Sequence, residues 1–317
     1  MSFANPTACR AASLPALVLI LVVLAPASAN ADKVLPSIAP NLVVHYDFDH
    51  PVAGDETRET DLGASGTPLW LVNGGGAMRV EDAAYPSAGR ALQTRQVDPT
   101  VNGNDDWKAG VYRASGAPAL AAFNAVRGIT IMGWIKPTGP NPGPDSTTPD
   151  RRDRFGAVGL FGLLSGTSDG HLVRALIEII TVADSQRLVA LGRRLDGGNR
   201  LLLVAREDWE DLLPTDRWTH LAASFDYDEG TMALYRNGER VPADYSGSHD
   251  GWQLSGEAKP RVTSATHPAG IKVGGSFPQN TVERNPFNGR FDDLMFFNRA
   301  LTGDEVRAQF AFFTGDP

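Results

Sequence analysis

The feature that most constrains the fold is the dipeptide Asn237-Gly238, which lies between two short runs of strand-forming residues. Asn and Gly both tolerate positive φ, so the pair is typical of a type I′ turn that joins antiparallel strands. Residues 231–236 and 239–241 flank this turn, and Asp228–Gly230 supplies another turn after residues 221–227. Two tight turns so close together predict a meander of antiparallel strands here.

A segment near the end of the chain adds a strand and a helix. Residues 291–297, FDDLMFF, have the composition of a strand, and strict alternation along it would place Asp292 on the same face as Leu294 and Phe296. Thr302 and Glu305 have the spacing of a capping box, in which each side chain accepts a hydrogen bond from a backbone amide. We therefore expect a short amphipathic helix from this point to about Phe310.

The rest of the sequence also favours strands. Apolar or alternating runs are separated by clusters of Gly, Pro, Asn and Asp, and no long helical pattern interrupts them. Two longer polar stretches, residues 137–153 and residues 243–269, are expected to be loops. The predicted fold class is all-β, with strands expected at 42–48, 69–72, 91–97, 109–113, 129–136, 156–164, 171–182, 187–195, 200–205, 218–227, 231–236, 270–275 and 291–297.

Five segments carry a resemblance when they are taken in order: VVHYDFDH from Val43, GITIMGWIKP from Gly128, WTHLAASFD from Trp218, LYRNGERV from Leu234 and NGRFDDLMFFNRAL from Asn288. Together they resemble the laminin-G-like (LamG-like) jelly-roll family, which is related to pentraxins and to concanavalin A-like lectins and glucanases. The resemblance implies a two-sheet antiparallel jelly-roll sandwich with a short C-terminal helix. It covers most of residues 32–317, which we expect to form a single domain.

Residues 1–31 have the organisation of a signal peptide. Arg10 precedes an apolar run at residues 14–24, and Ala29 and Ala31 occupy the positions that a signal peptidase reads. The apolar run is about half as long as the ~20 residues that a membrane helix needs, and no later segment approaches that length. We therefore expect cleavage near Ala31, a secreted or periplasmic protein of bacterial type, and no membrane span.

Removal of this segment also removes the sole cysteine, Cys9, so the mature chain must rely on its hydrophobic core. The remaining chain has 28 basic and 37 acidic residues, and thus a net charge of −9. This charge argues against nucleic acid and against anionic polysaccharide as bulk electrostatic partners, although a local basic patch could override the average.

The candidate metal site is a set of aspartates from both ends of the chain. The resemblance implies that aspartates of the opening Phe-Asp strand and of the FDD strand help to bind a structural calcium, which takes six to eight oxygen ligands. His50 stands where the family usually has an acidic residue. In the alternative, the carboxylates accept backbone amides or pair with Arg290 or Arg299. The candidate ligands are Asp49, Asp61, Asp292 and Asp293.

Tryptophans form the candidate ligand-binding site, because sugar rings stack on flat side chains. Trp107, Trp209 and Trp252 have polar neighbours and are candidate exposed platforms. The alternative is a half-buried tryptophan that anchors its own loop. Trp134 and Trp218 lie in strand motifs and are expected in the core.

Glycan-active enzymes share this architecture, so catalytic motifs must be considered. The sequence has no Glu-x-Asp-x-Glu strand of the kind that supplies acid and nucleophile in retaining glucanases. Residues 107–113 resemble the Lys-Ala-Gly-x-Tyr strand of alginate-type lyases, which would give roles to Tyr112, Lys108 or Arg113, but the companion strands are absent. His220 is expected to be a hydrogen-bonded structural histidine.

Three functional hypotheses follow. The leading one is a secreted, non-catalytic module that binds a carbohydrate or a cell-surface protein, with calcium as a structural cofactor. The second is a polysaccharide lyase. The third is a structural or protein-interaction component of the cell envelope.

Overall fold

The computed structural model describes Met1 and residues 33–97, 105–113, 116–123, 126–141, 158–164, 173–193, 200–246, 270–275 and 286–315. The predicted signal peptide, Trp252 and most of the two predicted loops lie outside these residues. Among the helices of the described part, none is long and apolar enough to cross a membrane.

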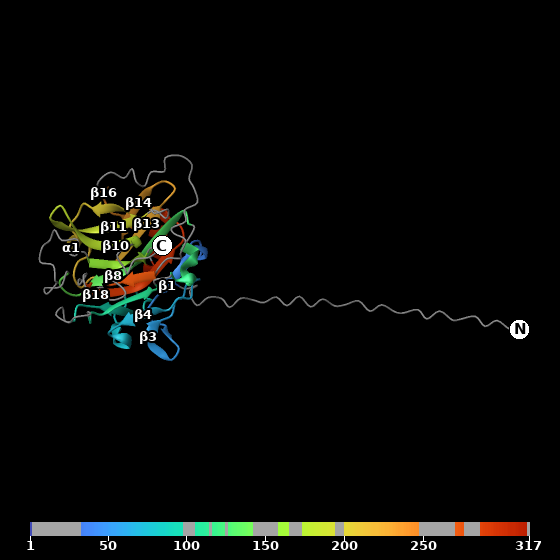
Figure 1. Cartoon of the computed structure of the whole chain (residues 1–317). Coiled ribbons are helices and arrows are strands. Elements are labelled where there is room, and N and C mark those ends of the chain that lie inside the picture. The colour runs from blue at the N-terminus through green and yellow to red at the C-terminus, as the bar shows by residue number, and fades with distance from the viewer. Residues whose placement is uncertain are drawn as a thin grey trace.

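Two antiparallel sheets form the body of the molecule (Figure 1). The eight-stranded sheet has the order β15-β14-β13-β8-β18-β6-β5, with β1 also paired to β18. Its strands are β1 (Leu42–Tyr46), β5 (Arg79–Glu81), β6 (Arg90–Thr94), β8 (Gly128–Pro137), β13 (Thr219–Asp226), β14 (Thr231–Arg236), β15 (Glu239–Arg240) and β18 (Gly289–Phe297).

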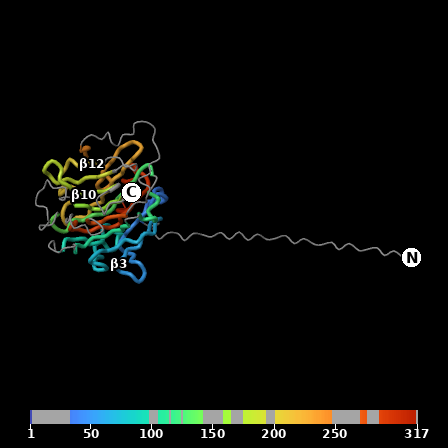
Figure 2. The backbone as a smooth tube through the Cα atoms, in the orientation of Figure 1, coloured from blue at the N-terminus to red at the C-terminus, as the bar shows by residue number. Residues whose placement is uncertain are grey.

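The ten-stranded sheet has the order β16-β12-β11-β10-β9-β17-β7-β4-β3-β2. Figure 2 shows β3 at one side of the body and β12 towards the other, as this order requires. The strand at Ala243–Tyr245 corrects the expectation that the irregular stretch begins at residue 243. The strands are β2 (Pro51–Val52), β3 (Asp55–Glu59), β4 (Leu69–Val72), β7 (Lys108–Tyr112), β9 (Val158–Leu164), β10 (Val173–Val182), β11 (Ser185–Arg193), β12 (Arg200–Ala205), β16 (Ala243–Tyr245) and β17 (Gly270–Val273).

The core lies between the two sheets. Side chains alternate along each strand, so every second residue of a strand reaches the shared interior. Phe161 of the ten-stranded sheet, for example, meets Phe291 and Phe296 of the eight-stranded sheet edge to face, with ring centroids 6.4 and 6.2 Å apart. This packing confirms the predicted two-sheet sandwich.

The predicted double hairpin is also confirmed. Strand β13 pairs with β14, and β14 pairs with β15 through the register Arg236 to Glu239. Asn237 and Gly238 between them have φ values of 49° and 80°, as a type I′ turn requires.

A terminal helix, α2 (Gly303–Thr314), packs on the outer face of the eight-stranded sheet. Both hydrogen bonds of the predicted capping box between Thr302 and Glu305 are present. The helix continues past the expected end at Phe310, and Gly315 stops it in the left-handed conformation at φ 72°. The shorter helical segments are α1 (Trp209–Leu212) and the 3-10 turns η1 (Ala39–Asn41), η2 (Gly75–Met78) and η3 (Pro118–Phe123).

Strand β18 departs from strict alternation. Its register against β8 shifts between Asp292 and Met295, and Asp293 at the shift has a φ of 44°. Asp292 is paired with Trp134 of β8, which belongs to the cluster on the outer face, whereas Leu294 and Phe296 face the core. The prediction that Asp292 shares their face is therefore wrong, because a β-bulge adds one residue to the strand.

His220 lies under helix α2 on the same outer face. Its ring is fully buried and packs against Trp134, Phe310 and Phe313 at centroid distances of 5.4 to 5.9 Å. The expected structural role fits this position, but within the described residues neither ring nitrogen has a hydrogen-bond partner. Burial lowers the pKa of His220 from 6.5 to about 3.

This pKa predicts an acid-sensitive fold. Between pH 6.5 and pH 3 the unfolded chain protonates His220 and the folded chain does not, so the free energy of unfolding should fall as the pH falls. The slope should approach about 1.4 kcal/mol per pH unit for this one group. Urea unfolding at pH 7, 6, 5 and 4 should show that His220→Phe flattens the dependence. Parallel pH profiles for the two proteins would contradict the assignment.

Candidate functional site

Four carboxylates from the two ends of the chain gather around one amine. Lys33 Nζ lies 3.1 Å from an oxygen of Asp47, 3.3 Å from one of Asp49 and 3.8 Å from one of Asp293. Asp292 is the neighbour of Asp293 at the bulge of β18. We call Asp47, Asp49, Asp292 and Asp293 the acidic cluster. Burial disfavours the Lys33 ammonium, but Asp293 and Asp47 outweigh it and raise its pKa.

The two β18 aspartates are fully buried. Asp293 is 2.6 Å from Nε2 of His45 and accepts a hydrogen bond from the Tyr85 hydroxyl. One oxygen of Asp292 accepts the backbone N–H of Asp293 at 2.8 Å, and the other has no partner in the described part of the chain. Burial, followed by the charge of Asp293, raises the pKa of Asp292 well above its usual value. This orphaned oxygen suits a bound cation or a proton.

Asp61 stands outside the acidic cluster. Its carboxylate accepts backbone N–H groups of His45 at 2.8 Å, Gly63 at 2.7 Å and Thr67 at 3.1 Å, and also the Ser65 hydroxyl. Both oxygens are therefore used in shaping the loop after β3. For Asp61, the structure has the backbone-amide arrangement that the sequence left open as an alternative to metal binding.

Asp47 was missed by sequence reasoning, although it immediately precedes the quoted Phe-Asp pair. A ligand atom of Asp47 lies within 4.8 Å of ligand atoms of His50 and Glu59. Glu59, however, accepts two hydrogen bonds from Arg79, at 2.8 and 2.6 Å. Its carboxylate is therefore paired with an arginine, and we do not count it among the candidate metal ligands. The expected arginine partners also pair elsewhere, Arg290 with Asp82 and Arg299 with Glu305.

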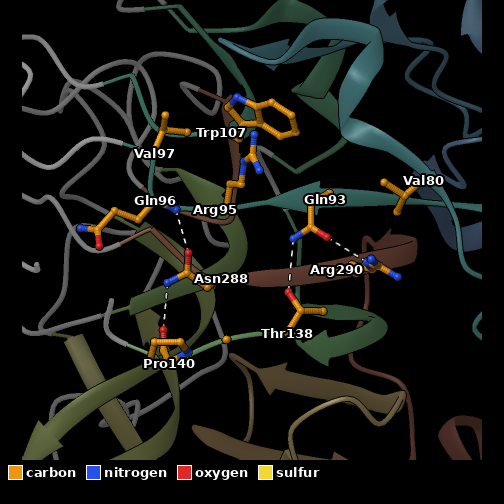
Figure 3. A pocket seen from close by; sticks show the side chains of 11 residues that line it. Val80, Gln93, Arg95, Gln96, Val97, Trp107, Thr138, Pro140, Asn288 and Arg290 are labelled. Atoms are coloured by element: carbon orange, nitrogen blue, oxygen red, sulfur yellow. Dashed lines mark hydrogen bonds between the residues drawn. The ribbon is translucent and has the colours of Figure 1, made fainter. Parts of the chain in front are cut away.

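A cavity of about 670 Å³ opens where β6 and β18 meet the segment after β8 (Figure 3). Trp107 lines it, so this predicted ligand-binding residue does face a pocket. Asn288 braces one wall, because it accepts the backbone N–H of Gln96 at 2.8 Å and donates to the Pro140 carbonyl at 2.8 Å. We call this cavity the Trp107 pocket; it is lined by Val80, Gln93, Arg95, Gln96, Val97, Trp107, Thr138, Gly139, Pro140, Asn288 and Arg290.

The Trp107 ring is not a bare platform. The Arg95 guanidinium lies over it, 3.8 Å from the ring centroid, as Figure 3 shows. Gly74 approaches so closely that a Cβ there would fall 2.7 and 2.8 Å from the Cδ2 and Cε2 atoms of Trp107. Those atoms form the bond shared by the two rings, so the approach is onto a face of the indole. The ring is thereby held in place and supports Arg95.

The other tryptophans are placed differently. Trp209 in α1 is 5% exposed and packs in the core, so the anchoring alternative fits it and an exposed platform does not. Trp134 is buried as expected, and Trp218 is partly buried. Trp70, which sequence reasoning did not select, is 48% exposed on β4 beneath the guanidinium of Arg58.

The lyase-like segment forms strand β7. Lys108 and Tyr112 share one face of the ten-stranded sheet, and Lys272 of β17 joins them because it pairs with Gly110 between them. Lys108 and Lys272 are buried, and the Tyr112 ring packs against an apolar cluster of Leu164, Leu176 and Leu191. Arg113 follows the strand and is exposed.

The fold and its register define a lectin-like jelly-roll sandwich. The family model described as the concanavalin A-like lectin/glucanases superfamily, a laminin-G type, matches residues 110–307, which is more than half of the chain. The protein therefore belongs to this family, as the sequence resemblance predicted. The search of curated proteins gave no match.

Solved structures support the same fold. The binding domain of botulinum neurotoxin DC, solved in complex with rat synaptotagmin II, matches with a TM-score of 0.52 and 11% identity over 87% of this chain. The binding domain of Paraclostridial Mosquitocidal Protein 1 matches with a TM-score of 0.51 and 16% identity over 86% of this chain. The chain spans about half of either structure, 53% and 52% respectively.

The contacts of Asp61 predict that it stabilises the fold independently of any metal. Asp61→Ala should leave buried N–H groups without acceptors and lower the free energy of unfolding by about 3 kcal/mol. Urea denaturation should show the same loss in calcium and in EDTA. A loss of stability seen only in calcium would show instead that Asp61 is a metal ligand.

Proposed function

We propose that the protein is a non-catalytic binding module whose ligand is a glycan at a cell surface. The observation that carries this proposal is the Trp107 pocket. Its volume lies within the range of about 300 to 1,000 Å³ that is usual for small-ligand sites. Its lining combines amide and hydroxyl groups with the exposed side chain of Val97, which suits a ring that has polar substituents and apolar C–H groups.

The comparisons support a binding role at a coarser level. Both structures reported above are binding domains by their own descriptions, and one was solved in complex with another protein, rat synaptotagmin II. We further propose that the chain acts outside the cytoplasm after removal of residues 1–31, because their sequence pattern is that of a signal peptide.

The glycan proposal predicts a specific effect of Trp107. In affinity electrophoresis against a panel of neutral and acidic polysaccharides, one class should retard the protein. Trp107→Ala should raise the Kd obtained from this retardation about tenfold or more, which is equivalent to about 1.4 kcal/mol. The matched control is Trp70→Ala, which removes an exposed tryptophan from another surface and should leave binding unchanged.

Two results would count against this proposal. If no polysaccharide retards the protein, the result would favour protein binding or a structural role. Growth of absorbance from unsaturated uronates, lost in Tyr112→Phe, would establish a lyase instead.

We also propose that the acidic cluster binds a structural calcium ion. Asp47, Asp49 and Asp292 offer the oxygen ligands that calcium prefers, and the unpartnered oxygen of Asp292 is the observation that supports the fit. Calcium would neutralise the buried carboxylates and compete with the Lys33 ammonium for their oxygens. The ion would thereby tie the first strand to β18.

Thermal melts in calcium and in EDTA test this proposal. Calcium should raise the melting temperature, because a ligand at 100 times its Kd stabilises the fold by about 2.7 kcal/mol. Asp292→Asn should abolish the response, and Lys33→Met, which removes the competing amine, should enlarge it. The control is Asp244→Asn, an exposed carboxylate paired with Arg206. Identical melts of the unmodified protein in calcium and EDTA would exclude the site.

A further inference from the structure

Arg95 presents an uncommitted positive charge in the Trp107 pocket. Its side chain is exposed, and its guanidinium lies 3.8 Å from the centroid of the Trp107 ring. Across the described residues, no carboxylate or carbonyl accepts a hydrogen bond from this guanidinium. Stacking on an indole leaves the in-plane N–H groups of an arginine free to donate.

The described residues that line the pocket add a further donor to Arg95. The side-chain nitrogen of Gln96 is buried and has no hydrogen-bond partner among the described residues. Arg290, in contrast, is committed, because it donates to Gln93 at 2.8 Å and pairs with Asp82. Among the described residues that line the pocket there is no aspartate or glutamate. The site therefore has an excess of donors and a local positive charge within an acidic protein.

We propose that the Trp107 pocket binds a carboxylate-bearing sugar of the uronic acid type, with Arg95 receiving the carboxylate. This inference rests on the proposed function, since it names the ligand class of the same pocket. A single free guanidinium bordered by amides and the Thr138 hydroxyl matches a ring with one carboxylate and several hydroxyls. An acidic peptide, which carries several charges, would leave all but one of its carboxylates without a counter-charge at this single guanidinium.

The stacking geometry explains why an arginine stands here. Trp107 holds the plane of the guanidinium, so less side-chain entropy is lost when two parallel N–H groups bind the two oxygens of one carboxylate. A lysine would offer a point charge without this fork. Because the protein carries a net charge of −8 over its whole sequence, attraction of an anion must come from this local charge and should weaken with salt.

Isothermal titration with trigalacturonate and with its methyl-esterified form tests the proposal. The acid form should bind the unmodified protein at least tenfold more tightly than the ester does. Arg95→Gln should remove this difference by weakening only the acid form, and Arg95→Lys should restore it in part. The matched control is Arg58→Gln, which removes an arginine stacked on Trp70 outside the pocket and should leave both affinities unchanged.

Each other outcome overturns a defined part of the proposal. Equal affinities for the acid and the ester would reject recognition of the carboxylate, but they would still support a glycan-binding module. Tighter binding of an acetylated poly-glutamate peptide than of trigalacturonate, lost in Arg95→Gln, would replace the sugar by a peptide. Binding of no glycan by a protein that still melts cooperatively would reject the proposed function itself.

Discussion

The β-bulge in strand β18 is the constraint on which the rest of the molecule depends. This strand pairs with β1, β6 and β8, and the extra residue at Asp293 reverses which side chains face the core. Leu294 and Phe296 can then close the sandwich while Asp292 points to the outer face. Without the shift, strict alternation would bury that carboxylate among the apolar side chains between the two sheets, at a cost of several kcal/mol. One irregular residue thus separates the apolar core from the acidic cluster.

The same strand joins the two candidate sites. Arg290 near its start lines the Trp107 pocket, and Asp292 and Asp293 in its middle contribute to the acidic cluster. Asp82 fixes the pocket end of this strand, because it accepts hydrogen bonds from Arg290, from Lys136 and from the Trp218 indole. A ligand in the pocket and a cation in the cluster would therefore act on one strand, although each site has its own chemistry.

Features governed by neighbouring residues could be predicted from the sequence. The turn at Asn237-Gly238 and the capping box at Thr302 and Glu305 depend on local backbone preferences, and both are present as expected. The bulge at Asp293 could not be predicted, because a period of two carries no sign of an inserted residue. Polar neighbours misled the interpretation of Trp209, since a short helix can bury one side chain and expose the next. The stacking of Arg95 on Trp107 depends on the isolated bridge between these two residues, which the sequence pattern does not specify.

The position of β18 also bears on how the chain is made. Its residues, 289–297, come near the end of the sequence, yet the strand lies in the interior of its sheet. During synthesis, β1 and β8 leave the ribosome long before β18, the partner that completes their hydrogen bonds. Until then, the edges that pair with β18 remain unpaired. Such long-range pairing makes folding slow, and the pairing of β1 and β8 with β18 can form only after β18 has been synthesised. A chain truncated before β18 therefore leaves β1 and β8 without the strand that joins them in the sheet.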